Sequence, residues 1–407
     1  MNKKLLIVKQ SEPLFIDNVN TRLWRASMIQ KYASKEGMKT TYLTSTFDHY
    51  TKKMRFKSTS MVERKFGKYV FLKTPGYSKN ISLARIWDSC VFGVKVFLHI
   101  FINQKDIDVI FVAFPTVESA FFASLSGKFL GKKVVVDVRD LWPDVIIDSL
   151  SPNFISRIIF QVLLLPYYIM ARLTFLMADS ISAPTQSYLD WAKARSLGGC
   201  SKMLLKLPFG YAACENNEFD PKFEAVYENQ IKGRKICMFA GTLNRMWNFE
   251  PLMYAAKSLE NDVLFLIAGD GSEKERLELE FSSCSNVIFL GWLGKEGLCS
   301  LMRLSTFGLA PYLPLNNFNK NVPNKIIEYL SSSLIVVYSL GGEIDSLLDG
   351  IGLRYAPESP NSLRNVLHDT LNSPSDLSKK SLASQALFQD FFDAKAVYTS
   401  FVRKHLQ

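Results

Sequence analysis

A lysine and a glutamate three positions apart, Lys325 and Glu328, lie in the segment Asn321 to Tyr329, NVPNKIIEY. Pro323 stands where a helix would begin, so the free N–H groups of that helix would lie at its N-terminus. A cation in the first turn is unfavourable unless it meets an anion such as a diphosphate. Glu328 would accept hydrogen bonds from the two hydroxyls of a ribose. A solvated Lys-x-x-Glu pair, worth roughly 0.2–0.5 kcal/mol, explains the same spacing equally well.

A second candidate anion site is the stretch from Gly241 to Arg245, GTLNR, which follows a predicted strand and precedes a predicted helix. Glycine lets the backbone approach a diphosphate, and Arg245 would neutralise the charge with paired hydrogen bonds. Asp270 follows the next predicted strand, between Gly269 and Gly271. An ordinary strand-to-helix turn with one surface arginine is the alternative interpretation of the first stretch.

In the first half of the chain, two acids, an arginine and a tryptophan follow a strand directly in DVRDLWPD, residues 137–144. Such side chains are poorly suited to a core, so a cleft position explains them better. Asp140 would bind a hydroxyl or act as a base toward it, with Arg139 beside it as the second candidate catalytic residue. The alternative is a structural Asp-Arg pair that caps the next helix.

Other catalytic and cofactor motifs find no support in the sequence. It contains no GxSxG, no GxxxxGK[ST], no HExxH and no metal-ligand spacing, and its four histidines are far apart. No DxD pair lies near the end of a predicted strand. The sequence therefore predicts neither a metal nor a bound cofactor.

Short apolar runs alternate with helical stretches along the whole chain, which predicts an α/β fold with parallel sheets. The predicted strands of the first half are 4–9, 40–44, 109–113, 133–138 and 179–183. Its predicted helices are 21–36, 117–130 and 154–177. This half forms a first Rossmann-like domain over residues 1–205.

The second half starts the same alternation again, over residues 206–380. Its predicted strands are 235–240, 263–268, 287–290, 307–310 and 334–338, and its predicted helices include 249–259 and 274–282. Ligands bind at the carboxyl ends of such strands. We expect a hinge near Pro208, and a final helix, within residues 381–407, that packs back onto the first domain.

The composition favours a globular protein with an anionic partner. Of 407 residues, 48% are hydrophobic and 21% charged, and the net charge is +11, from 49 basic and 38 acidic residues. The basic residues are spread along the chain without a nucleic-acid-binding motif, so nucleic acid is not the expected partner. The N-terminus is predicted to be a strand and not a signal peptide. The six cysteines show no CxxC spacing, which predicts reduced thiols and a cytoplasmic protein.

Two apolar stretches, residues 86–103 and 154–178, approach membrane character, but each is interrupted by charge. No stretch reaches the ~18 uninterrupted apolar residues of a transmembrane helix. A pair of buried core helices explains both stretches. Helix faces that dip into an anionic lipid interface explain them equally well, and the basic net charge favours this second interpretation.

Taken in order, a set of segments resembles glycosyltransferase family 4, whose members are retaining enzymes of the GT-B fold. The resemblance covers nearly the whole chain and is nearest to the bacterial branch that builds O-antigen and capsular polysaccharides, including N-acetylaminosugar transferases. The segments that carry it include VVVDVRDLWPD, FAGTLNRMWNFEPL, LIAGDGSEKERLE, NVIFLGWL and NVPNKIIEYLSSSLIVVYSLGGE. The resemblance implies two Rossmann-like domains that face a cleft.

The resemblance also implies roles for single residues. Glu328 corresponds to the acid that binds the ribose, and Arg245 and Lys325 to cations on the diphosphate. Trp292 and Leu293 fall in the segment that holds the base, and Asn20 and Arg22 in the acceptor-side loop and helix.

Three departures from the family pattern stand out. Lys320 replaces a second acid, so backbone N–H groups of Asn321 to Asn324 would contact the donor sugar. Arg139 and Asp140 stand where many members carry a histidine. The first loop has IDNV, residues 16–19, in place of a glycine pair.

The implied activity is transfer of a sugar, an N-acetylaminosugar in the nearest branch, from a nucleoside diphosphate donor such as a UDP-sugar. The implied acceptor is an undecaprenyl-diphosphate-linked glycan, at the inner face of the cytoplasmic membrane, in lipopolysaccharide or capsule synthesis. Two alternatives remain open: a nucleotide-sugar 2-epimerase of the same fold, and a nucleotide-sugar-binding scaffold without catalysis.

Overall fold

The computed structural model describes residues 3–14, 16–17, 22–150, 153–196, 203–215, 218–231, 233–313 and 318–407. The chain divides into two compact units. Unit 1 consists of residues 1–208 and 395–407, and unit 2 of residues 209–394. The sequence placed the boundaries at 205/206 and at about 381.

Unit 1 is built on an eight-stranded sheet in the order β10-β9-β8-β7-β1-β2-β6-β5. Its strands are parallel except for β5, which pairs antiparallel with β6. The strands are β1 Lys4–Val8, β2 Lys39–Ser45, β5 Ser60–Arg64, β6 Gly67–Leu72, β7 Val109–Phe114, β8 Lys133–Val138, β9 Ser180–Ala183 and β10 Met203–Lys206. A small ribbon of β3 Phe47–Asp48 and β4 Lys53–Met54 follows β2.

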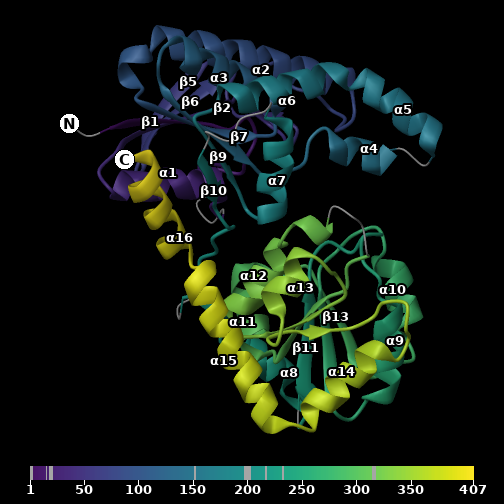
Figure 1. Cartoon of the computed structure of the whole chain (residues 1–407). Helices are drawn as coiled ribbons and strands as arrows, with labels where there is room; N and C mark the ends of the chain where they lie inside the picture. Colours follow the sequence, from purple (N-terminus) through teal and green to yellow (C-terminus); the bar gives the residue numbers. More distant parts are fainter. Residues whose placement is uncertain are drawn as a thin grey trace. The chain divides into compact units, whose positions relative to one another are not determined.

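Helices cover both faces of this sheet, as Figure 1 shows, with α2, α3 and α6 on one face and α1 and α16 on the other. The apolar residues of β7 and β8 are buried on both sides, which is typical of central parallel strands. The helices are α1 Arg25–Lys35, α2 Leu83–Ile102, α3 Val117–Phe129, α4 Asp144–Leu150, α5 Phe154–Leu163, α6 Leu165–Met177, α7 Gln186–Arg195 and α16 Ala394–Phe401, with short turns η1 Gln104–Asp106 and η4 Val402–Leu406.

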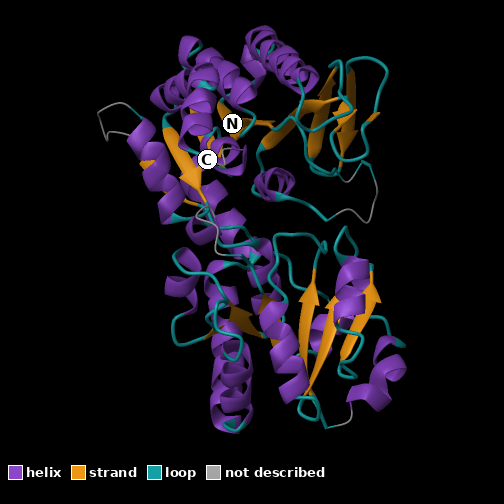
Figure 2. Ribbon diagram, turned by 90° about the vertical axis from the view of Figure 1, so that its right-hand side faces the viewer, coloured by secondary structure: helices purple, strands orange, loops and turns teal. Residues whose placement is uncertain are grey.

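Unit 2 contains a six-stranded, fully parallel sheet in the order β13-β12-β11-β14-β15-β16. Figure 2 shows several of these strands side by side as parallel arrows between helices. The strands are β11 Lys235–Ala240, β12 Val263–Ala268, β13 Val287–Gly291, β14 Phe307–Ala310, β15 Ile335–Tyr338 and β16 Leu353–Arg354. The first three strands run outward from β11 and the next three outward from β14. The order therefore reverses between β11 and β14.

Two hydrophobic clusters fill the two faces of the unit 2 sheet. One cluster joins the sheet to α11, α12 and α15, and the other joins it to α9, α10 and α14. The helices are α8 Phe223–Ile231, α9 Glu250–Ser258, α10 Lys274–Glu280, α11 Lys295–Leu304, α12 Asn324–Ser331, α13 Glu343–Leu348, α14 Ser362–Leu371 and α15 Pro374–Phe391, with a 3₁₀ turn η3 Phe318–Lys320. Two doubly wound Rossmann-like domains confirm the predicted fold class.

Two predictions about elements were wrong in detail. The single helix predicted over residues 154–177 is two helices, α5 and α6, which meet at an angle of 59°. Pro166 lies in the first turn of α6, where its missing N–H costs nothing, whereas inside one continuous helix it would remove a hydrogen bond. The helix predicted to begin at Thr21 begins at Arg25.

Among the described residues, no single helix is both long and apolar enough to cross a membrane. The bent pair α5–α6 meets that test only when its two helices are taken together, and only by length and composition.

The expectation that all cysteines are reduced is wrong for two of them. Cys214 and Cys299 form a disulfide, which connects the beginning of unit 2 to α11 across 85 positions of sequence. Cys90, Cys237 and Cys284 are free. Neither cysteine of the pair lies in a CxxC spacing, so no local pattern predicts this disulfide.

Candidate functional site

The candidate donor residues of unit 2 gather at one edge of its sheet. Gly241 follows β11, Asp270 follows β12 and Trp292 follows β13, and all three strands are parallel. Their carboxyl ends therefore lie together, at the edge where the strand order reverses between β11 and β14. Ligands of open α/β sheets bind at such a reversal point.

Lys325 lies in the first turn of α12, as the sequence predicts, and its ammonium group points back at the end of β11. Its Nζ lies 4.4 Å from the ring centre of Phe239 and 5.1 Å from that of Trp247. A Cβ added at Gly241 would lie 2.6 Å from the same nitrogen, so a larger residue there would displace the ammonium group from this position. Burial lowers the pKa of Lys325 to about 8, although the Glu328 carboxylate acts to raise it. An anion placed here would stabilise the charged form.

The N-terminus of α12 has the features of a candidate anion site. Pro323 is its N-cap residue, and no side-chain cap hydrogen bond is formed to the helix within the described residues. Asn324 is the first helical residue. The N–H groups, the helix dipole and the ammonium of Lys325 together provide the positive potential that a diphosphate requires.

Tyr329 fixes α12 in this position, a role that the sequence interpretation missed. Its ring packs against the backbone of β14, where a Cβ on Gly308 would lie 2.4 Å from ring atoms. Its hydroxyl donates to the Leu309 carbonyl at 3.1 Å and accepts from the Ala240 N–H at 3.3 Å. One side chain therefore connects α12 to both strands of the reversal point.

Glycines connect the loops after β11 and β12. Gly269 has a φ of +143°, and a Cβ there would lie 1.9 Å from the Gly241 carbonyl oxygen. Gly241 donates its N–H to Ala268, and Leu243 donates to the Asp270 carbonyl, each at 2.9 Å. Gly241 therefore lies close to Lys325 and to the loop after β12, and its predicted approach to a diphosphate stays a prediction.

Arg245 and Asp270 are both exposed at this edge. The Arg245 side chain is 91% exposed, and its Nε donates to Glu273 at 3.2 Å. Arg276 also binds Glu273, and these hydrogen bonds lower the pKa of its carboxyl group. Asp270 accepts only a local hydrogen bond from the N–H of Gly271, at 2.8 Å, among the contacts of the described chain. A surface ion pair of this kind costs little to open.

Trp292 and Leu293 follow β13 as predicted. Gly291 has a φ of +68°, which turns the chain sharply at the end of that strand. The Trp292 side chain is 77% exposed, whereas Leu293 packs on the core cluster that also contains α12. An exposed tryptophan at a strand end is available for stacking on a flat ligand.

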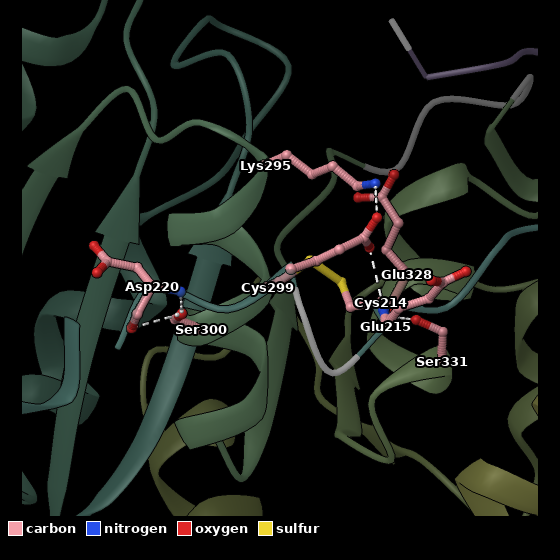
Figure 3. The surroundings of a disulfide bond; sticks show 9 residues. Cys214, Glu215, Asp220, Lys295, Cys299, Ser300, Glu328 and Ser331 are labelled. Atoms are coloured by element: carbon pink, nitrogen blue, oxygen red, sulfur yellow. Dashed lines mark hydrogen bonds and ion pairs between the residues drawn. A yellow bond between two sulfur atoms is a disulfide. The ribbon is translucent and has the colours of Figure 1, made fainter. Parts of the chain in front are cut away.

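Glu328 lies one turn after Lys325 and is half-buried. Its carboxylate raises the pKa of Tyr312, for which burial is the larger cause. Figure 3 shows Glu328 in the surroundings of the Cys214–Cys299 disulfide. Glu218 lies beside the same disulfide and forms an ion pair with Lys295 of α11. The disulfide therefore belongs to the framework around the candidate ribose-binding acid.

In unit 1, Arg139 lies in a cluster of buried charges at the ends of β1 and β8. It donates to Asp137 at 2.7 Å and to Glu12 at 3.1 Å, and Arg25 pairs with the other oxygen of Asp137 at 3.1 Å. Burial lowers the pKa of the Arg139 guanidinium, but the Asp137 and Glu12 carboxylates outweigh this and raise it. Arg139 is thus held in a buried ion-pair cluster, and no cap of the next helix by this arginine is found among the described residues.

Asp140 differs from Arg139 because its carboxylate is not used in an ion pair of this cluster. Its Oδ1 accepts the N–H of Leu141 at 2.9 Å. Burial raises its pKa, against the effects of that hydrogen bond and of the Lys9 ammonium. A carboxyl group with a raised pKa suits proton exchange with a hydroxyl.

Lys9 and His49 are further candidates that the sequence interpretation missed. Lys9 follows β1 directly, and burial followed by repulsion from Arg139 lowers its pKa to about 8. His49 follows β3, and burial followed by repulsion from Lys52 lowers its pKa to about 4. Each is a polar residue that directly follows a strand, which is the one pattern by which they could have been found. Lys9 lies at the sheet edge that also carries Asp140, and its ammonium is close enough to His49 to repel a charge there.

Of the two acceptor-side residues, Arg22 is exposed and precedes α1, and Asn20 lies outside the described residues.

Comparison with known proteins identifies the chemistry of unit 2. Residues 234–373 match the family model described as Glycosyl transferases group 1. This range contains β11 to β16 and every candidate donor residue named above. The chain is a glycosyltransferase. No curated protein matches it.

Solved structures show that the fold extends over both units of this glycosyltransferase. A sucrose-phosphate synthase from Thermosynechococcus elongatus is 13% identical, with 100% and 99% of the two chains covered and a TM-score of 0.66. The Anabaena protein Alr3699/HepE, solved in complex with UDP, is 12% identical, with 98% of each chain covered and a TM-score of 0.68.

A UDP-forming trehalose-phosphate synthase from Burkholderia xenovorans, solved with glucose-6-phosphate, is 12% identical, with both chains fully covered and a TM-score of 0.69. At such identities the likeness is one of fold, and the fold is GT-B.

Proposed function

We propose that this glycosyltransferase transfers a sugar, an N-acetylaminosugar by the resemblance of its sequence, from a UDP-sugar to a hydroxyl of a lipid-linked glycan. The observation that carries the donor half is the ammonium of Lys325, held against Gly241 at the uncapped N-terminus of α12. The similar fold of Alr3699/HepE was solved in complex with UDP and with UDP-glucose, which supports UDP as the nucleotide.

In the donor site, the bond between the anomeric carbon and the diphosphate oxygen breaks, and negative charge develops on the departing UDP. Lys325 and the N–H groups of α12 stabilise that charge without a metal ion. Arg245 leaves Glu273 to join them, at the small cost of an exposed ion pair. Glu328 binds the ribose hydroxyls, and Trp292 and Leu293 hold the base.

On the acceptor side, the attacking hydroxyl loses its proton as the new bond to the anomeric carbon forms. Asp140 binds this hydroxyl, and its raised pKa fits a group that shares a proton with the acceptor. Arg139 keeps the loop of Asp140 in place through Asp137 and Glu12. Arg22 and Asn20 complete the acceptor side. The new bond retains the anomeric configuration.

The pathway proposed for this reaction is bacterial surface polysaccharide synthesis, either O-antigen or capsule. The acceptor would be a glycan on undecaprenyl diphosphate, and the enzyme would act at the inner face of the cytoplasmic membrane. The resemblance of the sequence segments to that branch supports this proposal, as do the net charge of +11 and the exposed apolar residues of α5 and α6.

A thermal-shift screen against UDP and a panel of UDP-sugars tests the donor assignment, because a ligand that binds only the folded state raises the melting temperature. We expect a shift with UDP and a larger one with the true donor. Glu328→Ala should abolish the shift, whereas the exposed control Glu278→Ala on α10 should keep it. An unchanged shift in Glu328→Ala would remove this residue from the site.

Turnover then separates the proposal from its two alternatives. Sugar transfer to lipid-linked acceptors supports the proposal. Product formed without any acceptor would instead identify an epimerase. Donor binding without turnover against a full acceptor set would identify a scaffold.

A further inference from the structure

A cavity of about 430 Å³ lies in unit 1, between the helices that follow the Asp140 loop. Its lining includes Asp144, Arg157, Gln161, Leu165, Tyr168 and Arg195. These residues come from α4, α5, α6 and α7, and Asp144 begins α4 only four positions after Asp140. The volume is that of a small-molecule site. No residue of the donor site belongs to it.

The charge of the cavity favours an anion. Two arginines and one carboxylate line it, and that carboxylate is already engaged. Asp144 accepts from Tyr168 at 2.6 Å and from the Trp191 indole at 2.7 Å, and it forms an ion pair with Arg195. The Arg195 guanidinium also stacks on the Trp191 ring at 4.2 Å. Asp144 therefore holds one guanidinium at the wall, and Arg157 supplies a second from α5.

The helix that supplies Arg157 has an unusual surface. It is ten residues long, mostly apolar, and has no buried residue. The side chain of Phe154 is 76% exposed and that of Leu163 is 66% exposed. Its exposed apolar residues are Phe154, Ile155, Ile158, Ile159, Val162 and Leu163. Arg157 and Gln161, one turn apart, line the cavity instead.

The adjoining helix α6 also exposes apolar side chains, those of Leu165, Ile169, Leu173 and Leu176. Exposed apolar residues gathered on two adjoining helices mark a site of contact with another molecule or a membrane. Neither helix is long enough to cross a bilayer alone. A bent apolar pair with arginines beside it fits a helix pair that lies in the lipid interface, where basic residues meet phosphate groups.

We propose that this cavity binds the phosphate group of a lipid in a membrane, with the hydrocarbon chain of that lipid lying along the exposed face of α5 and α6. The two guanidinium groups bind phosphate oxygens, the geometry that arginine favours. The inference rests on the proposed function in one respect: the bound phosphate is that of the lipid-linked acceptor. Its sugar would then extend toward the loop of Asp140.

Vesicle co-sedimentation tests the proposal with two compositions, phosphatidylcholine alone and phosphatidylcholine with a few mole per cent of polyprenyl phosphate. We expect the full chain to bind the second at least about tenfold more tightly, since two charge-assisted contacts to phosphate are added. Arg157→Gln should remove this difference. Arg364→Gln, which changes a partly exposed arginine of unit 2, should keep it.

A separate variant tests the contact between the hydrocarbon chain and the exposed apolar residues of α5. The triple substitution Ile155→Ser, Ile159→Ser, Val162→Ser should abolish binding to both vesicles, because it removes three exposed apolar side chains from α5. Leu279→Ser removes an equally exposed leucine from α10 of unit 2 and should change nothing. An unchanged far-ultraviolet spectrum and melting temperature would show that the triple variant folds.

Three outcomes overturn the inference. Equal binding of wild type and Arg157→Gln to the phosphate-bearing vesicles would remove the cavity from the phosphate site. Binding of inorganic phosphate that Arg157→Gln abolishes, with no binding of the wild type to phosphate-bearing vesicles, would make the cavity a site for a free anion. Conversion of a dimer to a monomer by the triple variant, without an effect on vesicles, would assign the face to a second copy of the chain.

The UDP thermal shift separates this inference from the proposed function. A UDP shift with no phosphate-dependent vesicle binding overturns the inference and leaves the donor assignment intact. Phosphate-dependent vesicle binding without a UDP shift supports the lipid site and overturns the donor assignment.

Discussion

Lys325 places a buried positive charge at the start of α12. An ammonium group at the start of a helix, with a pKa lowered by burial, destabilises the protein in the absence of an anion, and its favourable contact with the Phe239 ring offsets part of this cost. A local loss of folding stability of this kind is expected at a functional site. With a diphosphate bound, Lys325 would stabilise the folded protein instead of destabilising it.

The stability of the ligand-free protein should depend on pH through Lys325. Its pKa is about 8 in the folded state and 10.5 ordinarily, so between these values the unfolded chain binds more protons and stability rises with pH. The variant Lys325→Met has no group that titrates there, so its stability should not rise in this way. At pH 7 its free energy of unfolding should exceed that of wild type by about 1–3 kcal/mol. Urea unfolding of both proteins at pH 7 and pH 10 measures the difference, which should shrink at the higher pH. A constant difference would contradict the lowered pKa.

Asp140 should matter for turnover and not for the donor. Asp140→Asn keeps the shape of the side chain but cannot accept a proton, so kcat should fall roughly 100-fold or more. The UDP thermal shift should be unchanged. Asp190→Asn, an exposed residue of α7, serves as the control. A normal kcat in Asp140→Asn would remove this residue from the catalytic step.

Sequence reasoning located Lys325, Glu328 and Gly241 because each stands at a fixed offset from a strand or a helix start. It did not find Tyr329 or Glu12 as parts of the sites. Tyr329 acts on Ala240, 89 positions away, and Glu12 on Arg139, 127 positions away. Contacts of such long range leave no local pattern, so only the folded chain reveals them.

At the scale of elements, α12 is the one whose position matters most. Tyr329→Phe removes the hydroxyl that bonds both β14 and β11, and leaves the N–H of Ala240 without this partner. We expect a loss of about 1–2 kcal/mol in the free energy of unfolding, together with weaker UDP binding. Thermal unfolding with and without UDP measures both. Tyr254→Phe, an exposed tyrosine of α9, should alter neither, and equal behaviour of the two variants would contradict the role of Tyr329.

The sequence predicted the central strands well, since buried parallel strands read as short apolar runs. The predicted ranges of β8, β11, β12 and β14 agree with the structure residue for residue. The edge hairpin β5–β6 was missed because β5 is largely exposed and carries charges. The break at Leu164 was missed because the apolar composition continues through it, and only Pro166 marks the new helix.

At the scale of the whole molecule, the fold is shared with proteins that are 12–13% identical. A fold held in common at such identities does not determine an acceptor. The acceptor must instead be inferred from parts of this chain such as α5, α6 and the cavity beside Asp140.

The disulfide gives a prediction for the stability of unit 2. It closes a loop across 85 positions, so its reduction should lower the free energy of unfolding by about 3–5 kcal/mol. Thermal melting with and without a reductant measures this loss of stability. The double variant Cys214→Ser, Cys299→Ser should melt like the reduced wild type in both conditions. Cys90→Ser is the control. A count of six free thiols in denaturant without reductant, instead of the four that remain after one disulfide forms among six cysteines, would contradict the pairing.

The central claim is that the nucleoside diphosphate lies at the N-terminus of α12 against Gly241. Calorimetric titration of UDP into wild type, Lys325→Met and the control Lys257→Met at pH 7 tests it most directly. We expect binding to wild type and to Lys257→Met, and an affinity at least roughly tenfold lower for Lys325→Met, because one charge-assisted contact is lost. Equal affinities in all three proteins would contradict it.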